Sequence, residues 1–221
     1  MNGPAAPPRR GRFITFEGGE GAGKSTQARR LAAHLEQAGV RVVVTREPGG
    51  SPQAEAIRKF ILSGRAAQLG PSGEAVLFSA ARLDHVDRLI APALASGTWV
   101  VCDRFADSTR AYQGAGSKAP AALIAALERI VVGPVRPDLT LLLDLPPETG
   151  LSRARNRSGA DADRFEAETL DFHAALRRAF LDIAASEPRR VKVVDAAAGE
   201  DEIADRVWAI VREALPVGVP S

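Results

Sequence analysis

The chain has 221 residues, of which 45% are hydrophobic, enough to build one sizeable core. Its 29 basic and 27 acidic residues leave a net charge of +2, and Arg9, Arg10 and Arg12 carry three of the positive charges. Without these three the rest of the chain stands at −1, which gives no case for a nucleic-acid partner. The single cysteine, Cys102, excludes an intramolecular disulfide and a cysteine-rich metal site.

The N-terminal segment 1–11 is rich in proline and lacks the apolar stretch of a signal peptide. No apolar run approaches the roughly 18 residues that a membrane span needs. We therefore predict a disordered tail over 1–11, or a short polyproline ligand there, followed by a single domain over 12–215. The composition indicates a cytoplasmic enzyme without a membrane partner.

Five apolar segments predict β-strands over 12–17, 40–45, 98–102, 139–145 and 190–194. Val42–Val44, Trp99–Val101 and Leu141–Leu143 are continuous rather than alternating runs. Such runs are typical of strands that helices bury on both faces, so the pattern predicts a five-stranded parallel sheet in an α/β fold.

Helical patterns occupy the segments between these strands. The first, over 24–38, has Ala28, Leu31, Ala32 and Leu35 on one face and ends at Gly39. The second begins at Ser51-Pro52, and further helices are expected over 73–96, 119–132, 147–157, 166–186 and 200–214. The polar stretch 157–165 predicts a short lid, which we place at about 153–166.

The most specific motif is GGEGAGKS, which lies between the first strand and the first helix. It has the Walker A spacing, in which glycines let backbone N–H groups approach phosphate oxygens at a helix N-terminus. Lys24 is expected to reach the β and γ phosphates of ATP, and Ser25 to bind Mg²⁺. The residues predicted to surround the phosphates are Gly18, Gly19, Glu20, Gly21, Ala22, Gly23, Lys24, Ser25 and Thr26.

Other motifs narrow the class of nucleotide-binding protein. The chain lacks the NKxD motif of GTPases and the LSGGQ signature of ABC ATPases, which favours a small-molecule kinase. Arg46 and Arg104 follow the second and third strands, where an open α/β sheet binds its ligands. Their planar guanidinium groups are suited to a second phosphate facing the Walker A loop, although a structural salt bridge is the alternative for each.

Taken together, the sequence resembles the thymidylate kinase family. The strings that carry the resemblance are FITFEGGEGAGKSTQ, TREPGG, LFSAAR, GTWVVCDRFADSTRAYQG, RPDLTLLLDLPPETGLSRARNR and DRFE, which together span about 13–166. The resemblance implies a P-loop NTPase fold and the reaction of ATP with dTMP to give ADP and dTDP, with Mg²⁺. It also implies a homodimer, for which the apolar face of helix 73–96 is available.

The resemblance assigns a role to individual acceptor-site residues. Glu20 resembles the P-loop carboxylate that contacts the sugar 3′-hydroxyl, and Tyr112 the ring that excludes a 2′-hydroxyl. Asp103 resembles the carboxylate near Mg²⁺. Arg46 and Arg104 resemble the arginines of the acceptor phosphate, while the base is expected to contact Phe78, Arg82, Thr109 and Gln113. From the residues alone, Phe78 and Tyr112 are equally consistent with core aromatics, and Arg82 with a solvated helix charge.

The catalytic arginine is expected in the lid, since the P-loop positions where the family's other arrangement has it carry Gly21 and Ala22. Arg153 and Arg157 share one helix face, where Arg153 is predicted to contact ATP. Arg155 or Arg164 is predicted to reach the transferring phosphoryl group, with no choice between them.

Two hypotheses compete with thymidylate kinase activity: a kinase for another nucleotide or a deoxynucleoside, and a P-loop ATPase that acts as a switch. His34, His85 and His173 have no metal-ligand spacing and are expected to be ordinary surface or helix residues. Cys102 is expected to be a small buried residue rather than a nucleophile.

Overall fold

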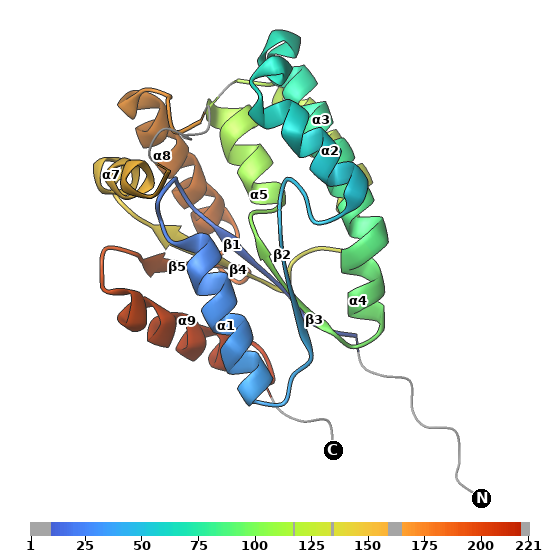
Figure 1. Cartoon of the computed structure of the whole chain (residues 1–221), viewed down its shortest axis with the longest axis vertical. Coiled ribbons are helices and arrows are strands. Elements are labelled where there is room, and N and C mark those ends of the chain that lie inside the picture. The colour runs from blue at the N-terminus through green and yellow to red at the C-terminus, as the bar shows by residue number, and fades with distance from the viewer. Residues whose placement is uncertain (1–9, 117, 134, 159–164, 218–221) are drawn as a thin grey trace, which may run out of the picture.

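The computed structural model describes residues 10–116, 118–133, 135–158 and 165–217. Its centre is a sheet of five parallel strands in the order β2-β3-β1-β4-β5. The strands are β1 Phe13–Glu17, β2 Val42–Arg46, β3 Trp99–Asp103, β4 Leu139–Asp144 and β5 Val191–Asp195. The predicted five-stranded α/β sheet is confirmed, and Figure 1 shows helices on both of its faces.

Helical segments connect the strands in the described part of the chain. They are α1 Lys24–Gln37, α2 Pro52–Leu62, the 3₁₀ segment η1 Arg65–Leu69, α3 Gly70–His85, the π-helical segment η2 Val86–Ile90 and α4 Ala91–Ala95. After β3 come α5 Ala106–Thr109, the π-helical segment η3 Arg110–Gly116 and α6 Ala121–Val131. The rest are α7 Pro147–Ser158, α8 Leu170–Ser186 and α9 Glu200–Ala214.

Alternate residues of the central strands enter two different cores. Ile14 and Phe16 of β1 pack with α1 and α9 on one face, whereas Phe13 packs with η2 and α4 on the other. The same alternation separates Val101 from Cys102 in β3. Because successive side chains of a strand point to opposite faces, a continuous apolar run is needed to fill both cores.

The prediction of burial on both faces is wrong for the second strand. β2 lies at the edge of the sheet, and the side chain of Val44 is 41% exposed. An edge strand has one neighbour and less helical cover, and its apolar run does not reveal this position.

Two helix predictions need correction, and one helical segment was missed. The helix expected over 73–96 starts at Gly70 and contains the π-helical segment η2 immediately before Pro92, whose missing N–H prevents a regular i to i−4 bond there. The helix expected from 166 begins at Leu170, with Thr169 capping it by accepting a bond from the Phe172 N–H at 3.2 Å. The helical segment 106–116, formed by α5 and η3, was not predicted.

Two further expectations concern the N-terminal tail and membrane-spanning helices. The predicted disordered tail 1–11 lies outside the described residues except for its last two, which contact the body. Gly11 N–H donates to the Leu94 carbonyl at 2.8 Å, and Arg10 pairs with Asp138. Among the helices of the described ranges, none is long and apolar enough to cross a membrane.

Candidate active site

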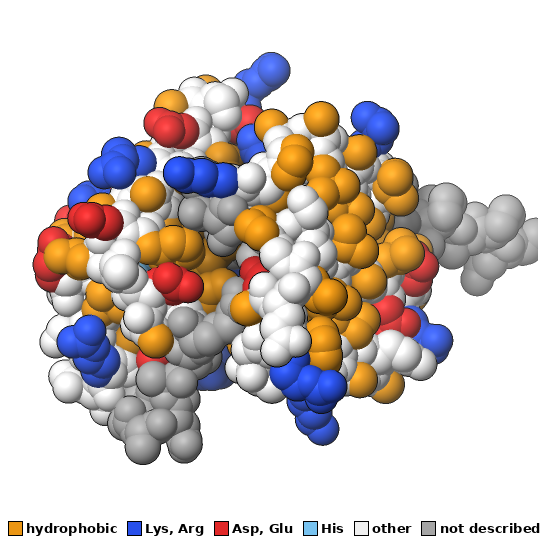
Figure 2. All heavy atoms as spheres, turned by 90° about the horizontal axis from the view of Figure 1, so that it is seen from above, with side chains coloured by type: hydrophobic (Ala, Val, Ile, Leu, Met, Phe, Trp, Pro, Cys, Tyr) orange, Lys and Arg blue, Asp and Glu red, His pale blue; other side chains and the backbone are white. Residues whose placement is uncertain are grey.

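A cavity of about 400 Å³ lies at the carboxyl ends of the central strands. Its position is the one at which open α/β sheets bind ligands. Figure 2 looks onto this end of the molecule and shows it hollowed between two halves. The predicted site residues that line the cavity are Glu20, Gly21, Gly23, Lys24, Ser25, Thr26, Arg46, Phe78, Asp103, Arg104, Thr109, Tyr112 and Gln113.

The predicted phosphate loop connects β1 to α1 and depends on glycine. Gly18, Gly21 and Gly23 have φ of 137°, 66° and 90°, which L side chains rarely adopt. A Cβ on Gly21 would collide with the Gly150 carbonyl oxygen, because the loop packs directly on α7. The Ala22 methyl is buried in the core, so this residue can only offer its backbone to a ligand.

Lys24 folds back over this loop, and its ammonium donates to the Gly19 carbonyl at 2.7 Å. Burial and the neighbouring Arg104 lower the pKa of Lys24 from 10.5 to about 8, although Glu20 and Asp103 oppose the shift. A phosphate group would supply the missing negative charge and favour the ammonium form. The geometry of the loop and the incompletely neutralised Lys24 ammonium are both suited to binding a triphosphate.

Ser25 and Asp103 meet at the mouth of the cavity. The Ser25 hydroxyl donates to Asp103 Oδ2, and both residues line the cavity. Hydroxyl and carboxylate oxygens are the hard ligands that Mg²⁺ prefers, and the ion usually retains several waters. The pair therefore fits the magnesium site predicted from the sequence, while no group of three or more His, Cys, Asp or Glu residues suited to a metal occurs in the described ranges.

The negative charge of Glu20, inside the phosphate loop, is stabilised by side chains that lie just after β3 and on η3. Its Oε1 accepts from Arg104 Nη2 at 2.7 Å and from the Tyr112 hydroxyl at 2.6 Å. Burial acts to raise the pKa of Glu20, but Arg104 and Lys24 outweigh it and lower the pKa to about 2. Glu20 is thus held as a charged acceptor facing the cavity, which is suited to a ligand hydroxyl.

Arg104 occupies the left-handed region with φ of 68°, which is uncommon for a side chain of this size. Its N–H donates to the Phe16 carbonyl at 2.9 Å, and its Nη1 donates to the Gly18 carbonyl at 3.2 Å. The guanidinium lies 5.0 Å from the Tyr112 ring centroid. Arg104 therefore contacts both the phosphate loop and the opposite wall of the cavity.

Two further arginines line the same cavity near the β2 end. Arg46 Nη2 donates to Glu55 Oε1 at 2.9 Å, and its side chain is half exposed. Arg58 on α2 donates to the Pro48 carbonyl at 2.7 Å and was not predicted as a site residue. It lies in an ordinary helical pattern after TREPGG, so no sequence motif distinguishes it.

Aromatic side chains form a wall beside these arginines. The Tyr112 and Phe165 rings lie 5.3 Å apart in an edge-on arrangement, and Phe78 is 6.4 Å from Phe165. Phe165 was not assigned a role from the sequence. Gln113 is buried, and its Nε2 has no hydrogen-bond partner among the described residues, which leaves a donor at the cavity wall.

Arg82 is the predicted acceptor residue that does not line the cavity. Its side chain is only 4% exposed, which overturns the alternative of a solvated helix charge. Nε donates to Glu47 Oε2 at 2.6 Å, and Nη2 donates to the Phe105 carbonyl and to Thr109 Oγ1, each at 3.0 Å.

The three histidines lie in helices, as expected, but two of them are buried rather than at the surface. His85 is fully buried against Glu47 and Thr45, and His173 is buried on α8. His34 is partly buried, 5.3 Å from the Trp208 ring. Cys102 is buried, as predicted, and burial raises the pKa of its thiol well above the usual value.

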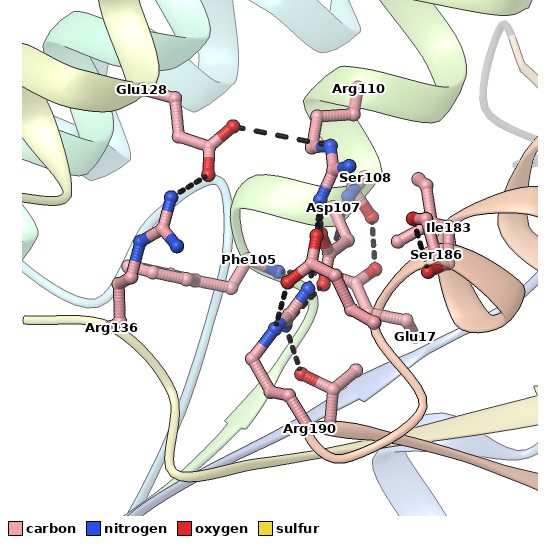
Figure 3. A network of polar contacts seen from close by, with 12 residues as sticks. Glu17, Phe105, Asp107, Ser108, Arg110, Glu128, Arg136, Ile183, Ser186 and Arg190 are labelled. Atoms are coloured by element: carbon pink, nitrogen blue, oxygen red, sulfur yellow. Dashed lines mark hydrogen bonds and ion pairs between the residues drawn. The ribbon is translucent and has the colours of Figure 1, made fainter. Parts of the chain in front are cut away.

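The helical segment 106–116, which carries Thr109, Tyr112 and Gln113, is fastened by the charged network in Figure 3. Asp107 accepts from Arg190 Nη1 at 2.7 Å and from Arg110 Nη1 at 2.9 Å. Glu187 accepts from the same two arginines, at 2.8 Å from Arg190 and 2.6 Å from Arg110. These four side chains form a closed ring of alternating charge, which we call the Asp107 ring.

Glu17, the last residue of β1, ties this segment to the phosphate loop. Its Oε1 accepts from the N–H groups of Phe105 and Ser108, and its Oε2 from the Ser108 hydroxyl at 2.6 Å. Burial and the nearby Asp107 raise the pKa of Glu17 from 4.5 to about 7. One carboxyl group thus links the start of the phosphate loop to the start of the acceptor segment.

The predicted lid arginines lie away from the cavity or outside the described residues. Arg153 donates to the Ala196 carbonyl at 3.0 Å, and Arg155 lines a separate cavity with Glu148 and Glu168. Arg164 lies outside the described residues, and so does the side chain of Arg157.

Comparison with known proteins decides the family. A sequence profile described as thymidylate kinase matches residues 16–207. The chain belongs to the thymidylate kinase family. A thymidylate kinase from a Bradyrhizobium species, strain BTAi1, is 57% identical over 209 residues, which cover 94% of this chain and 92% of the relative. A thymidylate kinase from Rhodopseudomonas palustris strain TIE-1 is 58% identical over 205 residues, covering 92% and 89%.

A solved thymidylate kinase shares the fold of this family member. The crystal structure from Ehrlichia chaffeensis superposes with a TM-score of 0.73 at 34% identity, covering 92% of this chain and 99% of that chain. The expected P-loop NTPase type of fold is thereby confirmed.

Proposed function

We propose that this chain transfers the γ-phosphoryl group of ATP to dTMP, giving ADP and dTDP. The observation that carries the proposal is that one cavity has the phosphate loop on one wall and Arg104, Tyr112 and Phe78 on the other. This arrangement suits two phosphorylated ligands that meet end to end. Family membership supports thymidylate as the acceptor.

On the donor side, the loop from Gly18 to Ser25 holds the ATP phosphates through backbone N–H groups and the Lys24 ammonium. Ser25 and Asp103 hold Mg²⁺, which when bound neutralises charge on the phosphate oxygens. Arg153 is proposed to contact the nucleotide from α7. These groups orient the γ-phosphoryl group toward the acceptor wall.

On the acceptor side, Arg46 and Arg104 bind the dTMP phosphate. The Glu20 carboxylate accepts from the sugar 3′-hydroxyl, and Tyr112, bonded to the same carboxylate, leaves no space for a 2′-hydroxyl. Phe78 stacks on the base, while Gln113 Nε2 and the Thr109 hydroxyl supply polar contacts. Arg82 does not itself line the cavity, and we propose that it contacts a base carbonyl from behind this wall.

The transfer itself needs little proton chemistry, because the acceptor oxygen already belongs to a phosphate anion. Positioning and charge stabilisation therefore provide most of the rate. We propose that Arg155 or Arg164 neutralises the transferring group. An arginine in this role is worth about 10³- to 10⁵-fold in rate in related phosphoryl transfers.

A coupled assay for ADP release tests the proposal. The protein is supplied with ATP and Mg²⁺ and, in turn, dTMP, dUMP, UMP, dCMP, AMP, GMP or no acceptor. We expect strong preference for dTMP and a negligible rate without acceptor. Preference for another nucleotide would overturn the acceptor assignment, and rapid hydrolysis without acceptor would indicate an ATPase.

We also propose that the chain acts as a homodimer in the cytoplasm, assembled through α3. Val76 and Leu83, two helical turns apart on α3, are 47% and 41% exposed, which is high for large apolar side chains. Figure 2 shows hydrophobic side chains gathered over the half of the molecule where Figure 1 places α2, α3 and α4. Sedimentation analysis of the wild type and of Val76→Glu tests this, since the variant is expected to be monomeric.

A further inference from the structure

At the acceptor side of the cavity lies a buried polar cluster, of which the reaction scheme above uses only Arg82. It consists of Thr45, Glu47, Arg82 and His85, which we call the Glu47 cluster. The side chains of Glu47 and Arg82 are each 4% exposed, and that of His85 is fully buried. Ionised groups so deep in a protein require specific partners, so the contacts within the cluster are informative.

Each oxygen of the Glu47 carboxylate has a partner of its own. Arg82 Nε donates to Oε2 at 2.6 Å, and His85 Nδ1 lies 3.0 Å from Oε1. A ring nitrogen facing a carboxylate oxygen must carry the hydrogen, so His85 Nδ1–H donates to Glu47. His85 Nε2 then pairs with the Thr45 hydroxyl at 2.7 Å. The order Arg82, Glu47, His85, Thr45 is thus a continuous chain of hydrogen bonds.

One end of the cluster holds the loop 45–50, which begins with the last two residues of β2. The Glu47 N–H donates to the Asp103 carbonyl at 2.9 Å, which ties the loop to the end of β3. A Cβ on Gly50 would collide with both His85 Nε2 and Thr45 Oγ1, so the loop backbone lies directly on the bond between them. This fixes the segment that presents Arg46 to the cavity.

The other end of the cluster fixes the Arg82 guanidinium. Nη2 donates to the Phe105 carbonyl and to Thr109 Oγ1, and the guanidinium lies 5.2 Å from the Phe105 ring centroid. The three hydrogen bonds of the guanidinium come from Nε and Nη2, so Nη1 is the group that we assign to a ligand. Phe78, one helical turn earlier on α3, and Thr109 both line the cavity.

We propose that Glu47 and His85 are positioning residues that set acceptor-base selectivity by holding Arg82 and the loop 45–50 in a fixed arrangement. The inference rests on the proposed function of Arg82. A guanidinium only donates hydrogen bonds, so a fixed Nη1 selects a base that offers a carbonyl oxygen over one that offers an amino group. Without Glu47 the long arginine side chain regains rotamer freedom, and this preference weakens.

The first test is Glu47→Gln, with dTMP and dCMP as alternative acceptors. The amide retains the shape of the side chain and one accepting oxygen but removes the charge that holds Arg82. We expect the KM for dTMP to rise about tenfold and the preference over dCMP to fall, while kcat and the KM for ATP stay within about twofold. Asp87→Asn removes an exposed carboxylate from the adjacent turn, η2, and serves as the matched control.

A second pair of variants remains informative if Glu47→Gln fails to fold. In His85→Asn the side-chain amide can still donate to Glu47, whereas in His85→Leu this bond is lost. The KM for dTMP is expected to rise in His85→Leu and to be largely rescued in His85→Asn. In the wild type, NMR is expected to show the Nδ1–H tautomer of His85 and a slowly exchanging Arg82 Nε–H.

Two results would overturn this inference but leave the proposed function standing. The first is an unchanged KM for dTMP and an unchanged discrimination against dCMP in folded Glu47→Gln and His85→Leu. The second is rapid exchange of Arg82 Nε–H in the wild type. An equal rise in the KM for ATP in these variants would also overturn it, by indicating a general structural role. Lack of dTMP turnover by the wild type would instead overturn the proposed function.

Discussion

The two walls of the cavity are built in different ways. The donor wall is a continuous stretch from Gly18 to Thr26, shaped by backbone dihedrals and the start of α1. The acceptor wall gathers side chains from the ends of β2 and β3, from α3 and from the segment 106–116, and buried contacts such as those of Glu47 with Arg82 and of Glu17 with Ser108 tie these parts together. Local geometry is therefore sufficient for phosphate binding, whereas acceptor binding depends on contacts between distant parts of the chain.

The largest loss of activity is expected from a substitution in the donor wall, at Lys24. Lys24→Ala removes the one ammonium group above the phosphate loop, and we expect kcat to fall about 10³-fold or more because charge stabilisation dominates phosphoryl transfer. The fold should survive, since the side chain bonds only to the loop itself. Steady-state kinetics and circular dichroism measure both, with the exposed Lys59→Ala as control. A near-normal kcat would remove Lys24 from the mechanism.

Arg104 contacts both walls of the cavity, so its removal tests whether donor binding and acceptor binding are independent. Arg104→Ala removes the guanidinium that is hydrogen-bonded to Glu20, and we expect the KM for dTMP to rise about 10²-fold. Arg46→Ala should have a smaller effect of about tenfold, because its side chain is half exposed.

In both arginine variants the KM for ATP is expected to change much less than the KM for dTMP. Arg212→Ala, an exposed arginine on α9, is the control. Wild-type KM for dTMP in both variants would refute the acceptor-phosphate assignment.

The backbone character of the donor wall predicts a contrast between two glycines. Gly21→Ala requires a left-handed alanine that collides with the Gly150 carbonyl, so we expect about 2 kcal/mol or more of lost stability and weaker ATP binding. Gly19→Ala places its methyl in open space and serves as the matched variant. Urea unfolding measures the difference, and equal losses would contradict the role of backbone conformation.

Glu17 connects the two walls, and its protonation predicts a smaller, pH-dependent effect. The folded pKa of about 7 lies above the usual 4.5, so the folded state keeps its proton longer and stability falls as pH rises between these values. Glu17→Gln should lack this pH-dependent loss, so the variant should gain stability relative to the wild type between pH 5 and pH 8.

Urea unfolding at pH 5 and pH 8 measures this pH-dependent change in the free energy of unfolding. Glu36→Gln, at an exposed carboxylate on α1, is the matched control. A wild type and a Glu17→Gln variant with the same pH dependence would show that Glu17 does not titrate in this range.

The sequence predicted the parts of this molecule that depend on neighbouring residues. The Walker A loop, the five strands and the ends of most helices follow from local pattern, and so do the positions of Arg46 and Arg104 after their strands. The burial of Arg82 and His85 could not be predicted, because their partner Glu47 is 35 and 38 residues away. Without the partner, a charged residue in a helix is expected at the surface.

The unpredicted segment 106–116 illustrates the same limit. It is short, ends in glycines and has polar side chains at the cavity, so it lacks a helical period. What stabilises it is the Asp107 ring, and Asp107 and Arg190 are 83 residues apart.

The Asp107 ring also limits the order in which parts of the protein can fold during synthesis. During synthesis the phosphate loop and α1 have all their sequence by residue 37, but Arg190 and Glu187 follow their partners Asp107 and Arg110 by 83 and 77 residues. The segment that carries Tyr112 therefore lacks these contacts until Glu187 and Arg190 have been synthesised. A nascent chain stalled before residue 187 is expected to have the sequence of its nucleotide loop complete but its acceptor wall open, and so to be a target for proteases and chaperones at that wall.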